Sequence, residues 1–300
     1  MKVTKNIAAS IRRKLLNRAQ ADNRPFNEIL QYYAMERFLY RLSLSPYAHQ
    51  FILKGALMLR VWNAPAARPT MDIDMLGRTS NEIENIIGQV KNILEIDVIA
   101  DGVIFDAITI QAQRIKEDAD YQGVRVKFKG SLELAKIHLQ IDVAFGDIIH
   151  PGPEELILPT ILDLPPPKLL AYSRESVIAE KFEAIVSLGF INSRMKDFYD
   201  IWLLLRQFDF HGAQLAEAIK LTFNQRATKF PAEVDAFTDL FIQTKQTQWM
   251  AFCKRLQQDY IPTDFKDIIL PTSSFLSPIL DAVTKGNTMP IIWTSSGQWS

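Results

Sequence analysis

Three aspartates stand in segments where strands are predicted, and their spacing suits divalent-cation chemistry. Asp72 and Asp74 are two residues apart in 70–76, which we predict to be a strand. Because side chains alternate between the two faces of a strand, both carboxylates point the same way and repel each other. A cation between them relieves that repulsion, and oxygen-rich sites suit Mg²⁺ or Mn²⁺. Asp142 lies on a later predicted strand, 138–145, opposite its apolar alternates, and is a candidate third ligand.

Three carboxylates holding two divalent ions are a known arrangement for phosphoryl chemistry. One ion activates the attacking hydroxyl, and the other stabilises the leaving pyrophosphate. Gly55 ends an apolar run ahead of Asp72, and a glycine there lets backbone N–H groups approach a phosphate closely. Acidic pairs are also common on exposed strands, where they do nothing but face solvent. The prediction of a phosphoryl-transfer site therefore depends on the glycine turn and the third carboxylate together.

The predicted elements that position these residues follow the order helices, strands with one interposed helix, and helices. Helices are predicted within 6–44 and over 80–95, the latter with Ser80 or Asn81 as cap. The later strands are predicted at 102–114, 124–129 and 138–145, and the pattern is helical again from 168 to about 260. This order predicts an α+β core over 51–165, an N-terminal helical segment over 1–50 and a helical C-terminal domain over 166–300.

Some segments give little sign of regular structure. A loop with two prolines is predicted over 63–69. Residues 151–167 are rich in proline, which predicts a linker or an edge crossing. The last thirty residues show no clear periodicity.

Two blocks of the sequence resemble motifs of one known family, the AbiEii/AbiGii-type toxins. Residues 51–57 (Phe-Ile-Leu-Lys-Gly-Ala-Leu) and 68–74 (Arg-Pro-Thr-Met-Asp-Ile-Asp) are similar to the family's first motif. Residues 179–184 (Ala-Glu-Lys-Phe-Glu-Ala) and 192–200 (Asn-Ser-Arg-Met-Lys-Asp-Phe-Tyr-Asp) are similar to its later Lys and Lys-Asp-x-x-Asp motifs. The resemblance extends, more weakly, from the N-terminal helices to about residue 205.

The resemblance implies a polymerase-β-like nucleotidyltransferase core, with a mixed sheet and helices. It implies Mg²⁺-dependent transfer of a nucleotide from a nucleoside triphosphate (NTP) to an acceptor, which in some members is the tRNA acceptor end. Members act as toxins of type IV toxin–antitoxin or phage-defence modules, and the partner implied is a separately encoded antitoxin. Alternatives are nucleotide transfer onto protein hydroxyls and a non-catalytic binding protein on the same fold.

The resemblance also assigns roles to single residues. Asp72 and Asp74 match the metal-binding pair, and Asp142 matches the third carboxylate. The nucleotide side is implied to involve Lys181, expected to face the triphosphate, and the late acidic residues Asp200 and Asp197.

The phosphate turn departs from the broader superfamily, where many relatives have Gly-Ser or Gly-Gly. Here Ala56 follows Gly55, so no hydroxyl is available at that position. Phosphate binding would then rest on backbone N–H groups, with Lys54 and Arg60 as candidate cations.

The second block can also be interpreted without the family. Ser173 and Gly189 are a plausible cap and stop for a helix that places Lys181 at the edge of its apolar stripe. A lysine there either extends its amine to water or faces an anion. Asp197 and Asp200 are three apart and share a face of the next helix. A helix salt pair between Lys196 and Asp200 is the structural alternative.

Composition narrows the class of protein. Lys+Arg and Asp+Glu are both 34, so the formal net charge is zero and any nucleic-acid contact must come from a local patch. Arg125, Lys127 and Lys129 on one strand face could form such a patch or be a solvated sheet face. The single cysteine, Cys253, excludes an internal disulfide and fits the cytoplasm. No apolar run suits a membrane span, and the four histidines lack the spacing of a zinc site.

Overall fold

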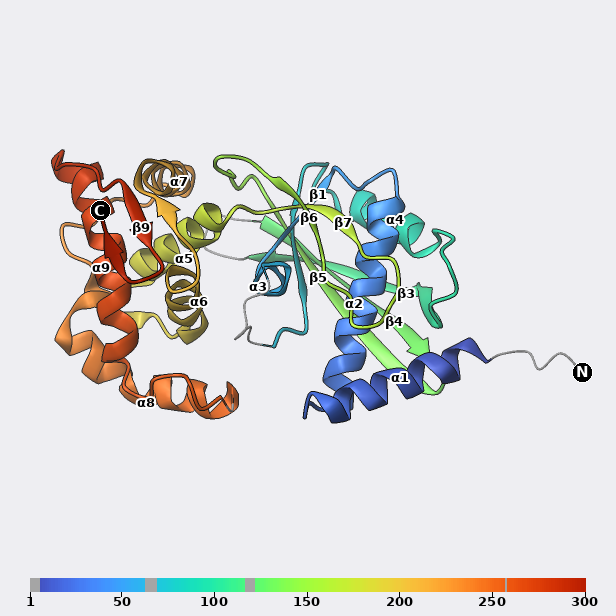
Figure 1. The fold of residues 1–300 in the computed structure, drawn as a ribbon. Coiled ribbons are helices and arrows are strands. Elements are labelled where there is room, and N and C mark those ends of the chain that lie inside the picture. The colour runs from blue at the N-terminus through green and yellow to red at the C-terminus, as the bar shows by residue number, and fades with distance from the viewer. Residues whose placement is uncertain (1–5, 63–68, 117–121, 257) are drawn as a thin grey trace, which may run out of the picture. The chain divides into compact units, whose positions relative to one another are not determined.

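The computed structural model describes residues 6–62, 69–116, 122–256 and 258–300. The chain divides into two compact units (Figure 1). The first contains the described residues of 1–63 and 69–146, together with 154–171. The second contains 147–153 and the described residues of 172–300. Among the helices that the structure describes, none is long and apolar enough to cross a membrane.

A seven-stranded mixed sheet is the framework of the first unit. Its strands are β1 (Phe51–Lys54), β2 (Ile73–Gly77), β3 (Val103–Lys116), β4 (Gln122–Leu132), β5 (Ala135–Phe145), β6 (Glu154–Ile157) and β7 (Lys168–Ala171). Their order across the sheet is β3-β4-β5-β2-β1-β7-β6. β2 is parallel to β5 and β1 is parallel to β7, while the other neighbours are antiparallel. The α+β class predicted from the sequence is therefore confirmed.

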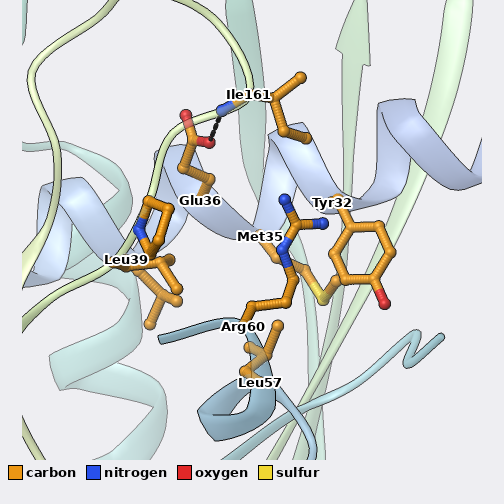
Figure 2. Close-up of a pocket in the computed structure, with 9 residues that line it drawn as sticks. Tyr32, Met35, Glu36, Leu39, Leu57, Arg60 and Ile161 are labelled. Atoms are coloured by element: carbon orange, nitrogen blue, oxygen red, sulfur yellow. Dashed lines mark hydrogen bonds between the residues drawn. The ribbon is translucent and has the colours of Figure 1, made fainter. Parts of the chain in front are cut away.

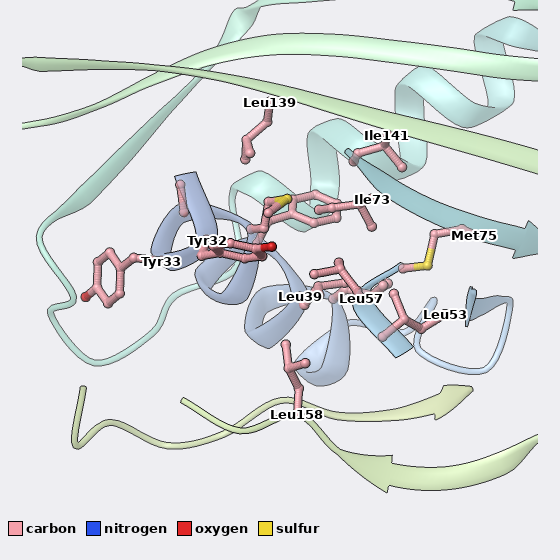
Figure 3. Packing of buried hydrophobic residues seen from close by; sticks show 14 of the residues in the cluster. Tyr32, Tyr33, Leu39, Leu53, Leu57, Ile73, Met75, Leu139, Ile141 and Leu158 are labelled. Carbon is pink, nitrogen blue, oxygen red and sulfur yellow. The ribbon is translucent and has the colours of Figure 1, made fainter. Parts of the chain in front are cut away.

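Helices cover one face of this sheet. The first unit contains α1 (Ile7–Ala21), α2 (Phe26–Leu44), α3 (Leu57–Val61) and α4 (Ile83–Leu94). Apolar alternates of the strands, such as Ile73, Met75 and Ile141, pack with Leu39 and Tyr33 of α2 in one buried cluster (Figure 3). Burial of one such side chain contributes about 1.5–3 kcal/mol, so this face fixes the register of the strands.

The other face of the same strands is polar. On β4, Val124, Val126 and Phe128 are buried, whereas Lys127 and Lys129 are exposed. β5 alternates in the same way, with polar residues at 138, 140 and 142 between buried apolar neighbours. The alternation predicted for both strands is confirmed. It places Asp142 on the face away from α1, α2 and α4, and the buried Ile73 and Met75 on either side of Asp74 place Asp74 on that same face.

The second unit is mainly helical. Its elements are α5 (Arg174–Leu188), η1 (Gly189–Ile191), α6 (Met195–Leu205), β8 (Phe210–His211), α7 (Gly212–Gln225), η2 (Asp235–Phe237), α8 (Asp239–Leu256), α9 (Lys266–Lys285), β9 (Ile292–Thr294) and β10 (Gln298–Trp299). The Ser173 hydroxyl accepts a hydrogen bond from the Ser176 N–H, and α5 ends at Gly189. Both predicted limits of this helix are therefore confirmed.

Several details of the sequence prediction were wrong. Residues 154–157 form edge strand β6, where a proline-rich neighbourhood is tolerated because an edge strand leaves some backbone groups unpaired. Helix α9 runs to Lys285, well into the stretch without clear periodicity, and contains Pro271 and Pro278. The N-cap of α4 is Glu82, not Ser80 or Asn81. The loop predicted over 63–69 lies, except for its last residue, outside the described residues.

Candidate active site

The turn at Gly55 is packed directly against the side chain of Asp74. Gly55 directly follows β1 and has a φ of +73°, a conformation that residues with a side chain strongly disfavour. A Cβ placed on Gly55 would lie 1.9 Å from Oδ2 of Asp74 and 2.7 Å from its Cγ. Only glycine therefore fits at this turn, and the predicted phosphate-binding backbone lies next to a predicted metal ligand.

Strand register aligns four charged residues in one row across the polar face. Lys54 on β1 pairs in register with Asp74 on β2, and Asp74 pairs with Asp142 on β5. Asp142 in turn pairs in register with Arg125 on β4. Because neighbouring strands lie about 4.8 Å apart, the two carboxylates are adjacent and are flanked by one cation on each side. Asp72, two residues before Asp74, adds a third negative charge at the start of β2.

Arg125 holds Asp142 in a two-pronged ion pair. Its Nε lies 2.8 Å from Oδ1 of Asp142, and its Nη2 lies 2.7 Å from Oδ2. The Gln140 amide donates a longer bond, of 3.3 Å, to the same Oδ2. This geometry fixes the carboxylate plane of Asp142, which is 7% exposed. Arg125 was predicted on this strand face from the sequence, but not as the partner of Asp142.

The oxygen-rich donor set of Asp72, Asp74 and Asp142 suits a hard cation such as Mg²⁺. Each carboxylate oxygen has two lone pairs, so Arg125 leaves Asp142 with acceptor capacity. Among the described residues, however, no group of three His, Cys, Asp or Glu side chains is arranged to hold a metal ion. The metal site predicted from the sequence therefore stays a prediction.

Gln31 of helix α2 forms hydrogen bonds with the backbone that leads to Asp72. The Gln31 amide donates to the carbonyl of Met71, at 3.2 Å, and to the carbonyl of His138, at 2.8 Å. Pairing between β2 and β5 begins only at Ile73, so the His138 carbonyl lies beyond that ladder and Gln31 supplies its partner. Gln31 thus joins the two chain segments that carry the predicted ligands. Sequence reasoning missed it, because a glutamine within a helix gives no sign of so distant a partner.

Arg60 lies against α2. Its guanidinium lies 4.4 Å from the centre of the Tyr32 ring, a cation–π contact, and Figure 2 shows it between Tyr32 and Glu36. The Tyr32 hydroxyl accepts a hydrogen bond from the Thr70 N–H at 2.8 Å. Burial raises the pKa of the Glu36 carboxyl, which accepts a bond from the Ile161 N–H at 2.7 Å. Arg60 therefore supports the tyrosine that holds the segment before Asp72.

The remaining predicted residues of the nucleotide side fall into two places. Ala56 is buried beside Gly55 and begins the turn into α3, and Lys54 is 8% exposed at the end of β1. Lys181, Asp197 and Asp200 belong to the second unit.

Lys181 links α5 to α6 through two ion pairs. Its Nζ lies 2.9 Å from Oδ1 of Asp197 and 2.8 Å from Oδ2 of Asp200. Arg194 approaches the other oxygen of Asp197 at 2.8 Å. The Asp197 and Asp200 side chains are both 1% exposed, and that of Lys181 is 14% exposed. Two cations thus balance two buried carboxylates, and loss of either cation would leave a buried charge uncompensated.

Comparisons with known proteins identify the family and agree with the fold. The family described as "Nucleotidyl transferase AbiEii toxin, Type IV TA system" matches residues 37–270. The crystal structure of a proposed nucleotidyltransferase from H. pylori is similar over 87% of this chain and 97% of its own, with a TM-score of 0.51 and 15% identity. The structure of JHP933 from Helicobacter pylori is similar over 86% and 94%, with the same TM-score and identity. At this identity the likeness concerns the fold alone. Among curated proteins none matches the sequence.

We predict that Gly55→Ala destabilises the protein by about 1–3 kcal/mol, because it forces a side chain into a left-handed turn and onto Asp74. Thermal or urea unfolding measures the change. The matched control is Gly88→Ala on α4, where an added Cβ meets nothing within 4 Å. That change should stabilise the helix by about 0.5–1 kcal/mol. Equal effects of the two substitutions would contradict the packing described at Gly55.

We predict that Gln31→Ala costs about 1–3 kcal/mol, because it leaves two backbone carbonyls without their donor. Gln20→Ala, at an exposed position of α1, is the control and should stay within about 0.5 kcal/mol of the wild type. Urea unfolding of the two variants gives the comparison. A Gln31→Ala protein as stable as the control would show that this amide does not fasten the two segments.

We predict that Lys181→Met lowers the free energy of unfolding by about 3–5 kcal/mol, because it leaves two buried carboxylates without their shared cation. Adding Asp200→Asn should recover part of the loss, since it removes one of the two unpaired buried charges. Lys220→Met, which breaks an exposed pair with Glu217, is the control and should change stability by less than about 1 kcal/mol. Chemical denaturation measures all three, and an unchanged Lys181→Met protein would refute the structural role of the cluster.

Proposed function

The chain belongs to the AbiEii family of nucleotidyl transferase toxins of type IV toxin–antitoxin systems, and from this premise we propose that it transfers a nucleotide from an NTP to an RNA acceptor. The observation that carries the proposal is the Gly55 turn packed on Asp74, with Asp142 in register on the next strand. A backbone turn free of side chains suits a triphosphate, and adjacent carboxylates suit the cation that accompanies it.

The reaction proposed is a displacement at the α-phosphorus. The acceptor hydroxyl oxygen forms a bond to that phosphorus, and the bond from the α-phosphorus to the oxygen that bridges it to the β-phosphate breaks. Pyrophosphate leaves with the bonding electrons, and Asp142 helps to remove the hydroxyl proton. Backbone N–H groups at Gly55 and Ala56 cradle the triphosphate, with Lys54 as the cation in register with Asp74. Arg60, whose guanidinium lies over the Tyr32 ring, is the second candidate cation only by its position in the sequence motif. This assignment gives the leaving group its binding site and the nucleophile its base.

Asp72, Asp74 and Asp142 are the residues that would hold Mg²⁺ or Mn²⁺. When bound, such an ion supplies Lewis-acid stabilisation of the charge that develops on the transferred phosphate. The register of β2 and β5 supports this choice, because it places Asp74 and Asp142 side by side. A cation bound between them would offset the repulsion of the two carboxylates. For Lys181, Asp197 and Asp200, a role in nucleotide binding rests on the family resemblance alone.

The acceptor proposed is the tRNA acceptor end, which the family resemblance implies. Protein hydroxyls are the alternative acceptor, and the fate of a label from the NTP distinguishes the two. Membership of a type IV toxin family also implies an antitoxin, which we propose is encoded as a separate protein. Toxicity of the expressed chain and its relief by that partner would follow from the transfer reaction.

We predict that Asp74→Asn lowers transfer more than about 100-fold while the fold stays intact, because asparagine keeps the shape under Gly55 but loses the charge. The assay combines purified protein, Mg²⁺, each α-labelled NTP in turn, and total tRNA or cell lysate. Asp97→Asn, an exposed aspartate after α4, is the control and should transfer as the wild type does. Label transferred equally by Asp74→Asn and the wild type would refute this catalytic assignment.

A further inference from the structure

A groove opens on the polar sheet face beside residues 71–72 and 138–140, just before β2 and β5 begin to pair at Ile73 and Ile141. Its volume is about 540 Å³, within the range of ligand sites. Asp72 lies in its wall at the end nearest the carboxylate row, because Asp72 directly precedes β2. Besides Asp72, the polar part of the lining comes from α2, β3, β4 and β5: Gln31, Thr109, Gln111, Lys127, Lys129, His138 and Gln140.

Two lysines give the groove its charge. Lys127 and Lys129 are exposed and share one face of β4, with Lys127 in register with Gln140 and Lys129 with His138. Within the described ranges, neither lysine has a carboxylate at ion-pair distance, whereas their neighbour Arg125 is held by Asp142. Their backbones are separated by two residues, or about 6.7 Å along the strand. They can therefore contact successive anionic groups of one extended ligand.

The groove and the Gly55 turn lie on opposite sides of β2. β2 carries Asp72 and Asp74 and lies between β5 and β1 in the sheet. Gly55 follows β1 on one side, and the groove lies toward β5 and β4 on the other. If the turn cradles the donor triphosphate, the opposite side is where an acceptor hydroxyl can approach the α-phosphorus in line with the leaving pyrophosphate.

We propose that this groove binds the sugar–phosphate backbone of a single-stranded RNA acceptor, with Lys127 and Lys129 on its phosphates and its reacting end at Asp72. The inference rests on the proposed function and adds the residues that select the acceptor. Two exposed lysines that form no ion pair among the described residues complement a polyanion. Gln111 and Gln140 offer amides that can bond riboses or base edges. A protein segment of mixed charge gains little from such a lining, so the groove favours RNA over protein hydroxyls.

The test compares Lys127→Gln/Lys129→Gln with Lys14→Gln/Lys91→Gln, two exposed lysines on α1 and α4. For the groove variant, KM for total tRNA should rise about tenfold, while KM for the NTP and the melting temperature stay unchanged. Binding of a short single-stranded oligoribonucleotide should lose salt dependence, with the slope of log K against log salt falling by roughly 1.4 for two phosphate contacts. The control variant should match the wild type in every measurement.

The outcomes separate the groove from the function on which it rests. If the wild type transfers label to tRNA and the groove variant has the same KM and salt slope as the wild type, the groove does not bind the RNA. The proposed transferase activity would still stand. Label transferred to protein, with no binding of the oligoribonucleotide, would overturn the RNA acceptor. If the wild type transferred no label to any acceptor, the proposed function itself would fail, and the groove would lose its role.

Discussion

The close approach of Gly55 to Asp74 is the constraint on which the active-site arrangement depends. A backbone turn can lie on a carboxylate only if no side chain intervenes, and the positive φ at Gly55 allows that approach. The antiparallel register of β1 and β2 then fixes Lys54 opposite Asp74, and the parallel register of β2 and β5 brings Asp142 alongside. The proposed donor site, the pair of Asp74 and Asp142 and the cation Lys54 follow from these two pairings, and the pairing of β4 with β5 adds Arg125.

The row of charged residues is maintained because the apolar side chains on the opposite face of the same strands are buried in the core. Asp74 and Asp142 repel each other, and such a pair alone would favour a shift of register. A shift by one residue would turn buried side chains such as Ile73 and Ile141 out to the surface, at a cost of several kcal/mol. Gln31 adds a local fastening where the ladder between β2 and β5 begins. The apolar core thus maintains a charge arrangement that chemistry requires.

Local patterns made part of this arrangement predictable. Period-two alternation placed Asp142 on the face opposite its apolar neighbours, and capping rules found both ends of α5. Neither could reveal which strands become neighbours, so the Arg125 pair with Asp142 and the contacts of Gln31 were found only in the folded chain. Helix α9 forms despite Pro271 and Pro278, because its buried stripe is stabilised by packing that outweighs local propensity.

The proposed function requires the aspartates beside Gly55 to bind a divalent ion together with an NTP. Titration of Mn²⁺ followed by electron paramagnetic resonance, with and without a non-hydrolysable NTP analogue, tests it directly. We expect the wild type to bind Mn²⁺ more tightly when the analogue is present and Asp74→Asn to lose this binding. Mn²⁺ binding that is the same in both proteins, or indifferent to the analogue, would show that these aspartates do not bind the ion with the NTP.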